Sequence, residues 1–340
     1  MPTTRYKTLM RYLNRRDLLE MAVLATLIFV SDRLAFWGVF GDRFPLRPAA
    51  PLWISSGLSV AAILLRGYRL WPGVLGGILA ASLVAGCPFG VALGLGIATS
   101  LESVLATHLL RRLLNFRNSL DRISDVVGFV IFAMGISPVV GATLSVTSLW
   151  LGGIVSETGF VSVWWLWWLE SATGVLLLAP VVLVWGSQPL PRWRGTQLLE
   201  AGILFLLVVL VEQSIYGQGI STDISNALTY SIFPLVIWAA IGFGQHGVVT
   251  VALLVAGIAV RGTILGYGPF YVLNSYQTSL LLLYGFTTAV SVMGMLLAAS
   301  LSEYKSTADA LGVSESKFRT LFDSASDAIF IHDLGGRFLE

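Results

Sequence analysis

Two acidic side chains inside apolar stretches have the clearest chemical meaning in this sequence. Glu102 and Glu170 each lie near the middle of a hydrophobic run. A carboxylate at mid-membrane depth costs at least about 2.5 kcal/mol unless it is paired or protonated. Such groups face the interior of a helix bundle and commonly mark a functional site. The alternative is a neutral carboxyl that only bonds a neighbouring serine or backbone carbonyl.

Tryptophans gather just before Glu170, at Trp164, Trp165, Trp167 and Trp168. Trp164 and Trp168 share a helix face, and tryptophan at the outer end of a span usually lies in the membrane interface. Four in five residues exceed what an interface requires. We therefore expect some of them to point inward and to wall a cavity beside Glu170, suited to an apolar or cationic ligand.

Asp32 and Arg33 lie inside the first hydrophobic run but are neighbours in sequence, so they cannot pair on one helix. Arg33 could meet Glu170 or Glu212, whereas Asp32 could simply approach the outer interface. The histidines are far apart, and the chain has a single cysteine. We therefore expect no metal site, no catalytic group and no enzyme activity within these 340 residues.

Composition defines the class of protein. Hydrophobic residues make up 56% of the chain, charged residues 12%, and the mean hydropathy is +0.80. A soluble chain carries about twice that share of charge. The elements that position the carboxyl groups are thus membrane helices, in an all-α polytopic bundle whose first partner is the lipid bilayer, with no role in binding nucleic acid. The hydrophobic runs lie at about 18–38, 52–66, 70–86, 90–110, 124–148, 162–185, 198–216, 227–243, 247–261 and 277–301.

The distribution of arginine and lysine predicts the orientation. Residues 1–16 contain five basic residues and no acid, which places this segment in the cytoplasm. Threading ten spans puts thirteen basic residues inside and three outside, with both termini cytoplasmic. The two runs within 52–86 are short for a membrane about 30 Å thick, so they could form a re-entrant hairpin. Eight to ten spans are therefore expected.

The composition changes abruptly after the last run. Apolar residues then follow at spacings of three and four, which is typical of a helix that pairs with a second copy of itself. Docking of an amphipathic helix on its own domain is the equal alternative. We expect this stripe to carry a movement of the last membrane helix out of the membrane. Its residues are Leu301, Tyr304, Ala308, Leu311 and Phe318.

Residues 318–340 resemble the opening helix and first strands of a PAS sensor domain. Strand-like residues precede a turn at 333–336, and a returning strand begins at Arg337. A half-built hairpin has no partner, so we expect the natural protein to continue. The resemblance implies a truncated α+β PAS-like domain, whose cofactor, if any, is unknown; none is expected in the membrane part.

A second resemblance covers roughly residues 15–302. Its motifs are Trp53-Ile-Ser-Ser-Gly57, Leu70-Trp-Pro-Gly73, Ser100-Leu-Glu102, Trp168-Leu-Glu170 through Gly174, and Ala179-Pro180. Their order resembles the bacterial membrane-associated sensor (MASE) domain family, first type. That family usually has Pro-Pro or Pro-Ala where this chain has Ile54-Ser55, and Gly-Asp where it has Leu169-Glu170.

The resemblance implies a homodimeric sensor in the bacterial inner membrane that answers an unknown small-molecule or membrane-protein signal. We expect a basic segment at 1–16, a membrane sensor domain at 17–302, a signalling helix at 303–317 and the PAS start at 318–340. The output would be a histidine kinase or a GGDEF-type diguanylate cyclase or phosphodiesterase. The sensing candidates are Glu102, Glu170, Trp53, Trp164, Trp165, Trp168, Arg33 and Asp32. The competing class is a secondary transporter with a regulatory cytoplasmic domain.

Overall fold

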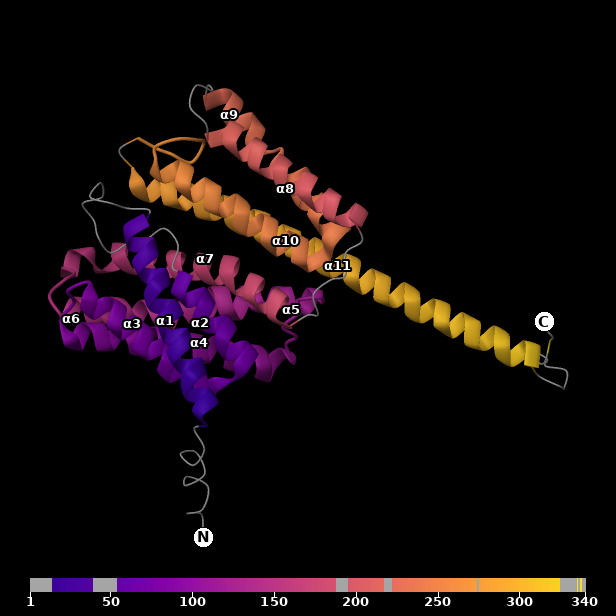
Figure 1. Ribbon diagram of the computed structural model, residues 1–340, viewed down its shortest axis with the longest axis horizontal. Coiled ribbons are helices and arrows are strands. Elements are labelled where there is room, and N and C mark those ends of the chain that lie inside the picture. The colour runs from indigo at the N-terminus through magenta and orange to yellow at the C-terminus, as the bar shows by residue number, and fades with distance from the viewer. Residues whose placement is uncertain are drawn as a thin grey trace, which may run out of the picture.

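The structure is a computed structural model, and it describes residues 14–38, 54–187, 195–216, 222–273 and 275–324, together with residues 335 and 337. Every regular element in these ranges is a helix, as the composition predicts (Figure 1). The longer helices are α1 (Arg15–Gly38), α2 (Ile54–Arg66), α3 (Trp71–Val84), α4 (Phe89–Leu114), α6 (Ser137–Leu151), α7 (Phe160–Ser187), α8 (Gly195–Tyr216), α10 (Ile232–Ile264) and α11 (Tyr276–Ser324). The shorter ones are η2 (Tyr68–Leu70), α5 (Ile123–Gly128), the π-helix η3 (Phe129–Ile136), η4 (Glu157–Gly159) and α9 (Thr222–Thr229).

Six of the described helical segments are long and apolar enough to cross a membrane: α4, α5 with α6, α7, α8, α9 with α10, and α11. The chain is therefore a multi-pass membrane protein. Two further apolar helices are shorter, α2 with 13 residues and α3 with 14. At 1.5 Å per residue each covers about 20 Å of a hydrocarbon core about 30 Å thick.

The bundle has two halves that meet at α7 (Figure 1). In the first half, α1 to α7, helix α2 packs on α7 and α4, α1 packs on α3, and α4 packs on α3 and α6. In the second half, α8 to α11, helix α10 packs on α11 and α8. Helix α7 also contacts α10 and α11, so it is the helix that joins the two halves.

Glycines permit the closest helix contacts of the first half. A Cβ at Gly57 of α2 would overlap the Gly174 carbonyl of α7. On α3, a Cβ at Gly73 or Gly77 would come within 2.7 or 2.8 Å of a backbone carbonyl of α1. Backbones approach this closely only where side chains are absent, as is common between membrane helices.

Helix α10 contains a reversal at Gly244. This residue has φ 59° and ψ −143°, a conformation that side chains disfavour. A Cβ at Gly247 would lie 2.7 Å from the Ala239 carbonyl, although residues eight apart in a straight helix are about 12 Å apart. Residues 232–243 and 245–264 therefore fold back on each other. The break lies between the hydrophobic runs predicted at 227–243 and 247–261.

Helix α11 runs as one helix of 49 residues from Tyr276 to Ser324. Leu301 still packs partly on the core, and residues 304–320 are exposed (Figure 1, yellow extension). The expected linker at 303–317 is thus an uninterrupted continuation of the last membrane helix. Most of the PAS-like segment, 325–334, 336 and 338–340, lies outside the described residues.

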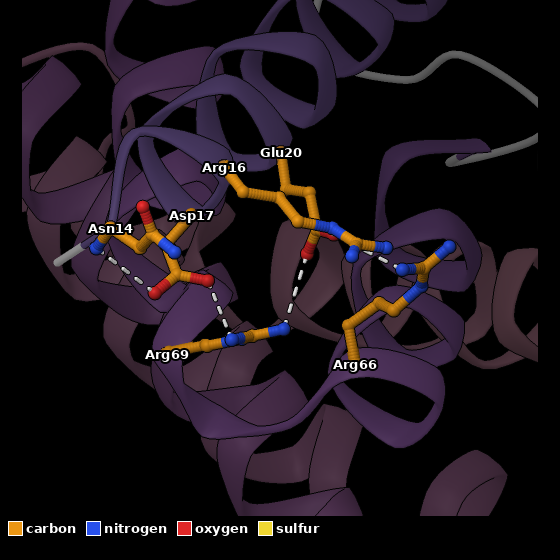
Figure 2. Close-up of polar contacts among 6 residues, drawn as sticks. All are labelled: Asn14, Arg16, Asp17, Glu20, Arg66 and Arg69. Carbon is orange, nitrogen blue, oxygen red and sulfur yellow. Dashed lines mark hydrogen bonds and ion pairs between the residues drawn. The ribbon is translucent and has the colours of Figure 1, made fainter.

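One end of the bundle is rich in arginine, and we call it the basic end; it carries Arg66, Arg69, Arg111, Arg117 and Arg122. Figure 2 shows Arg66 and Arg69 reaching toward the acidic side chains at the start of α1. Arg69 bonds Asp17 at 2.5 Å and Glu20 at 3.4 Å, and Arg66 bonds Glu20 at 3.1 Å. These pairs fasten α1 to the turn between α2 and α3.

Candidate functional site

Glu102 lies at the meeting point of four helices. Its side chain, 2% exposed, projects from the middle of α4. Glu102 Oε1 lies 2.5 Å from the Ser171 hydroxyl of α7, which lies 2.9 Å from the Ser56 hydroxyl of α2. A Cβ at Gly141 of α6 would overlap Glu102 Oε2. We call Glu102, Ser171 and Ser56 the carboxyl–serine cluster.

The cluster holds its protons in one of two arrangements. Ser171 has one hydroxyl proton but two oxygen neighbours, so it donates to one and accepts from the other. Either a protonated Glu102 donates to Ser171, which donates to Ser56, or Ser56 donates to Ser171, which donates to the Glu102 carboxylate. The two arrangements differ by one proton on Glu102.

The local sequence explains why these groups can meet. Ser56 precedes Gly57, and Ser171 is one helical turn before Gly174, the pair at which α2 and α7 touch. Close backbone contact therefore brings two short hydroxyl side chains within hydrogen-bond range. Gly141 likewise leaves room for the carboxyl group of Glu102 on α6.

Glu170 is 1% exposed, and its Oε1 has no hydrogen-bond partner in the structure. It adjoins Ser171, so the structure brings the two predicted glutamates to the same region and turns both away from lipid. Further hydroxyl groups on α2 and α4 are buried without a partner: Ser55, Ser59 and Thr107. The first half thus concentrates polar atoms between α2, α4 and α7.

Asp32 and Arg33 lie at the edge of this region and are both half-buried. Asp32 lies beside Ser55 of α2, although the Ser55 hydroxyl makes no hydrogen bond of normal geometry. Arg33 lies near the thiol of Cys87. The suggested pairing of Arg33 with Glu212 is wrong, because neither Glu212 carboxyl oxygen has a hydrogen-bond partner in the structure. Helix α1 packs in the first half, whereas α8 packs on α9 and α10.

Two of the α7 tryptophans donate hydrogen bonds to the elements packed beside α7. Trp164 donates to the Thr143 hydroxyl of α6 at 3.0 Å, and Trp168 donates to the Gly135 carbonyl of the π-helix at 3.0 Å. Trp165 is 48% exposed and stacks between them, with ring centroids 5.9 and 5.0 Å away. These contacts direct Trp164 and Trp168 toward η3 and α6; the ligand cavity beside Glu170 remains a prediction. Trp53 lies outside the described residues.

A chain of contacts joins this region to α11 along the basic end. Arg111 of α4 donates to the Leu64 carbonyl at the end of α2, at 2.6 Å. The loop after α4 continues to Leu120, whose carbonyl accepts from Gln245 at the α10 reversal, at 2.7 Å. Gln245 also donates to the Met295 carbonyl of α11 at 3.0 Å.

A second contact fixes α11 where it leaves the bundle. Glu303 accepts a hydrogen bond from the Ile123 amide at 3.1 Å, at the first turn of α5. A carboxylate at a helix N-terminus is stabilised by the unpaired amides there. This hydrogen bond joins the start of α5 to α11 at the point where α11 leaves the bundle.

Sequence reasoning missed Ser56, Ser171 and Gly141 as partners of Glu102, and Gln245 and Glu303 as contacts of the exit helix. Serine in an apolar helix usually bonds the carbonyl one turn earlier, as Ser100 and Ser103 do here. Its type alone does not show that it reaches across to another helix. The available signal was the nearness of Ser56 to Gly57, a residue that permits close approach.

Comparisons with known proteins relate the sequence to one relative and one family. The chain is 28% identical to the probable diguanylate cyclase DgcE of Escherichia coli (strain K12) over 166 residues, which are 47% of this chain and 14% of that protein. The chain thus spans a small part of that relative. No solved structure matches. The MASE1 family profile matches residues 45–305, which are most of the sequence and include the helices from α2 to the membrane part of α11. The chain therefore belongs to the MASE1 family of membrane sensor domains.

Proposed function

We propose that this chain is the sensory input module of a bacterial inner-membrane signalling protein. The bundle adopts two packing states, a signal favours one of them, and α11 carries the difference to an output domain. The observation that carries this proposal is the continuity of α11, a single helix that packs in the bundle and extends beyond it. Because no flexible joint interrupts it, a rigid helix transmits rotation or sliding along its whole length.

The proposed route begins at the carboxyl–serine cluster. A change in α2–α7 packing alters α7, which contacts both α10 and α11. A parallel route follows Arg111, the loop after α4 and Gln245 to the Met295 carbonyl. Both routes end on α11, the second of them at Met295.

The orientation follows from the basic end, whose arginines favour the cytoplasm. In this arrangement the chain crosses ten times, with α2, α3 and the two parts of α10 counted separately, and both termini are cytoplasmic. A reporter that works only outside the cytoplasm should then be active after Gly159 or Gly268 and inactive after Asn115. Activity at Asn115 would reverse the orientation.

The exposed stripe on α11 supports a homodimer. Tyr304, Leu311 and Phe318 are 74%, 70% and 62% exposed in the single chain, and Ala308 shares their spacing. Pairing with the same helix of a second copy would cover these side chains. The dimer would then continue into the PAS-like segment and an output domain, a diguanylate cyclase or a histidine kinase.

The test changes the phase of α11 in the full-length protein. Deleting one residue near Lys305 turns everything downstream by about 100°, whereas deleting seven restores the phase of the stripe. We expect single deletions to fix the output high or low and seven-residue deletions to preserve regulation. Output activity is measured across deletions of one to seven residues, with deletions in residues 1–13 as the control. Output that ignores the phase would refute transmission by α11.

A further inference from the structure

Both oxygens of the Glu102 carboxyl group are already in tight contact. Oε1 lies 2.5 Å from Ser171 Oγ, and Oε2 packs against Gly141. A metal ion held between two oxygens would keep each of them about 2.0 Å or more from itself. The distance between Glu102 Oε1 and Ser171 Oγ is too short to hold a metal ion between them, and only a proton fits there.

The helices around Glu102 carry few other titratable or charged groups. Helices α3, η3 and α6 have none, and α7 has only Glu170. The remaining groups on α2, α4 and α5 are Arg66, His108, Arg111, Arg112 and Asp125, and Asp32 of α1, which is next to Arg33, adjoins Ser55 of α2. The groups that contact the two Glu102 oxygens, Ser171 and Gly141, are uncharged, so nothing in direct contact would neutralise an ionised Glu102.

We propose that a proton is the ligand of the carboxyl–serine cluster, bound on Glu102 and exchanged through Ser171 and Ser56. This inference rests on the proposed sensory function and names its ligand. On release, α2 and α7 separate so that water reaches the buried Ser56; the Glu102 proton then moves to Ser171, the Ser171 proton moves to Ser56, and the Ser56 proton passes to that water. Both serines end with one proton each, and Glu102 becomes a carboxylate that accepts from Ser171.

Release of the proton changes the packing of the first half. A buried carboxylate without a cation is unfavourable, so the ionised state favours any movement that admits water between α2, α4 and α7. Because Gly57 touches Gly174 at this point, separation of α2 and α7 would let water reach the cluster. A proton on Glu102 thus stabilises the closely packed state, and its loss stabilises a looser one.

Infrared difference spectroscopy tests proton binding directly. The chain is placed in lipid nanodiscs, and spectra are recorded from acidic to alkaline pH. We expect a protonated-carboxyl band that disappears as the pH rises, is absent in Glu102→Gln, and shifts in frequency in Ser171→Ala. Glu212→Gln, which alters a buried glutamate of the second half, is the matched control and should retain the band.

Two results would overturn the proposal: a carboxyl titration that loses no component in Glu102→Gln, or a Glu102 band that responds to sodium at constant pH. Spin labels at the exposed positions Val127 and Tyr304, with Cys87 replaced, then report the distance between α5 and α11. We expect this distance to change with pH in the parent chain and to stay at its acidic value in Glu102→Gln. A band that titrates while the distance stays constant would establish the proton site and refute transmission through α11.

Discussion

Two of the buried glutamates, Glu102 in the first half of the bundle and Glu212 in the second, have different surroundings. Glu102 is joined to Ser171, and through it to Ser56, so three helices share one hydrogen-bonded group. Glu212, fully buried in α8, has no hydrogen-bond partner at either carboxyl oxygen within the structure. Burial alone does not make a connected site. What distinguishes Glu102 is that glycines bring hydroxyl groups from neighbouring helices to it.

The largest expected effect is an opposite change in stability when each of the two glutamates is replaced by leucine. Glu102→Leu removes a partner of Ser171 and forces a branched side chain against Gly141, so it should destabilise the fold by about 2–3 kcal/mol. Glu212→Leu removes an unpartnered buried carboxyl group and should stabilise by up to about 2 kcal/mol. Unfolding in mixed micelles with increasing SDS measures both. Equal effects of the same sign would remove the distinction between the halves.

The next effect compares close contacts in the two halves. Gly57→Ala directs a methyl group at the Gly174 carbonyl, which cannot move aside, and should cost about 1–3 kcal/mol. Gly294→Ala of α11 meets only methyl groups of Val236 and Val248, which can rotate, so its cost should be below about 1 kcal/mol.

Gly76→Ala is the matched control, because nothing lies within 4 Å of the added methyl group. It should stabilise its helix by up to about 1 kcal/mol. Thermal unfolding of the three variants in one detergent ranks them. A Gly57→Ala variant as stable as Gly76→Ala would show that α2 and α7 are not in close contact.

A smaller effect concerns the tryptophans of the first half. Trp168→Phe removes the hydrogen bond to the Gly135 carbonyl and should cost about 1 kcal/mol, because that carbonyl loses a partner. Trp165→Phe changes a half-exposed ring and should stay within about 0.5 kcal/mol. Both variants are compared by thermal unfolding. A larger loss at Trp165 would mean that ring stacking, and not the hydrogen bond, stabilises this face.

The smallest effect belongs to the ion pairs of the basic end. Arg66 is 54% exposed, so Arg66→Gln should cost no more than about 0.5 kcal/mol, and added salt should remove the difference. The stability change caused by Glu102→Leu should not depend on salt, because the contacts of Glu102 are buried. Repeating the unfolding measurements at low and high salt checks both expectations, and a salt-sensitive Glu102→Leu variant would place this site in contact with water.

The sequence predicts the membrane helices because a run of apolar residues can be recognised from residue type alone. Glu102 and Glu170 stood out because a charged residue in an apolar run is rare, and the break near Gly244 coincides with the polar pair Gln245 and His246. The partners of Glu102 could not be predicted, because serine is common in membrane helices and its reach depends on the distance between backbones. Helix α11 was divided at residue 303 because its composition changes there, although its backbone does not.

The length of the exposed part of α11 has a mechanical consequence. From Leu301 to Ser324 the helix extends about 35 Å, at 1.5 Å per residue. The contacts at Met295 and Glu303, about 12 Å apart along the helix, hold its base, where the helix can pivot. A tilt of about 5° at that pivot would then displace the far end by about 3 Å, which follows from the helix rise. A movement too small to open a channel between the membrane helices would still be large at the distal tip of this lever.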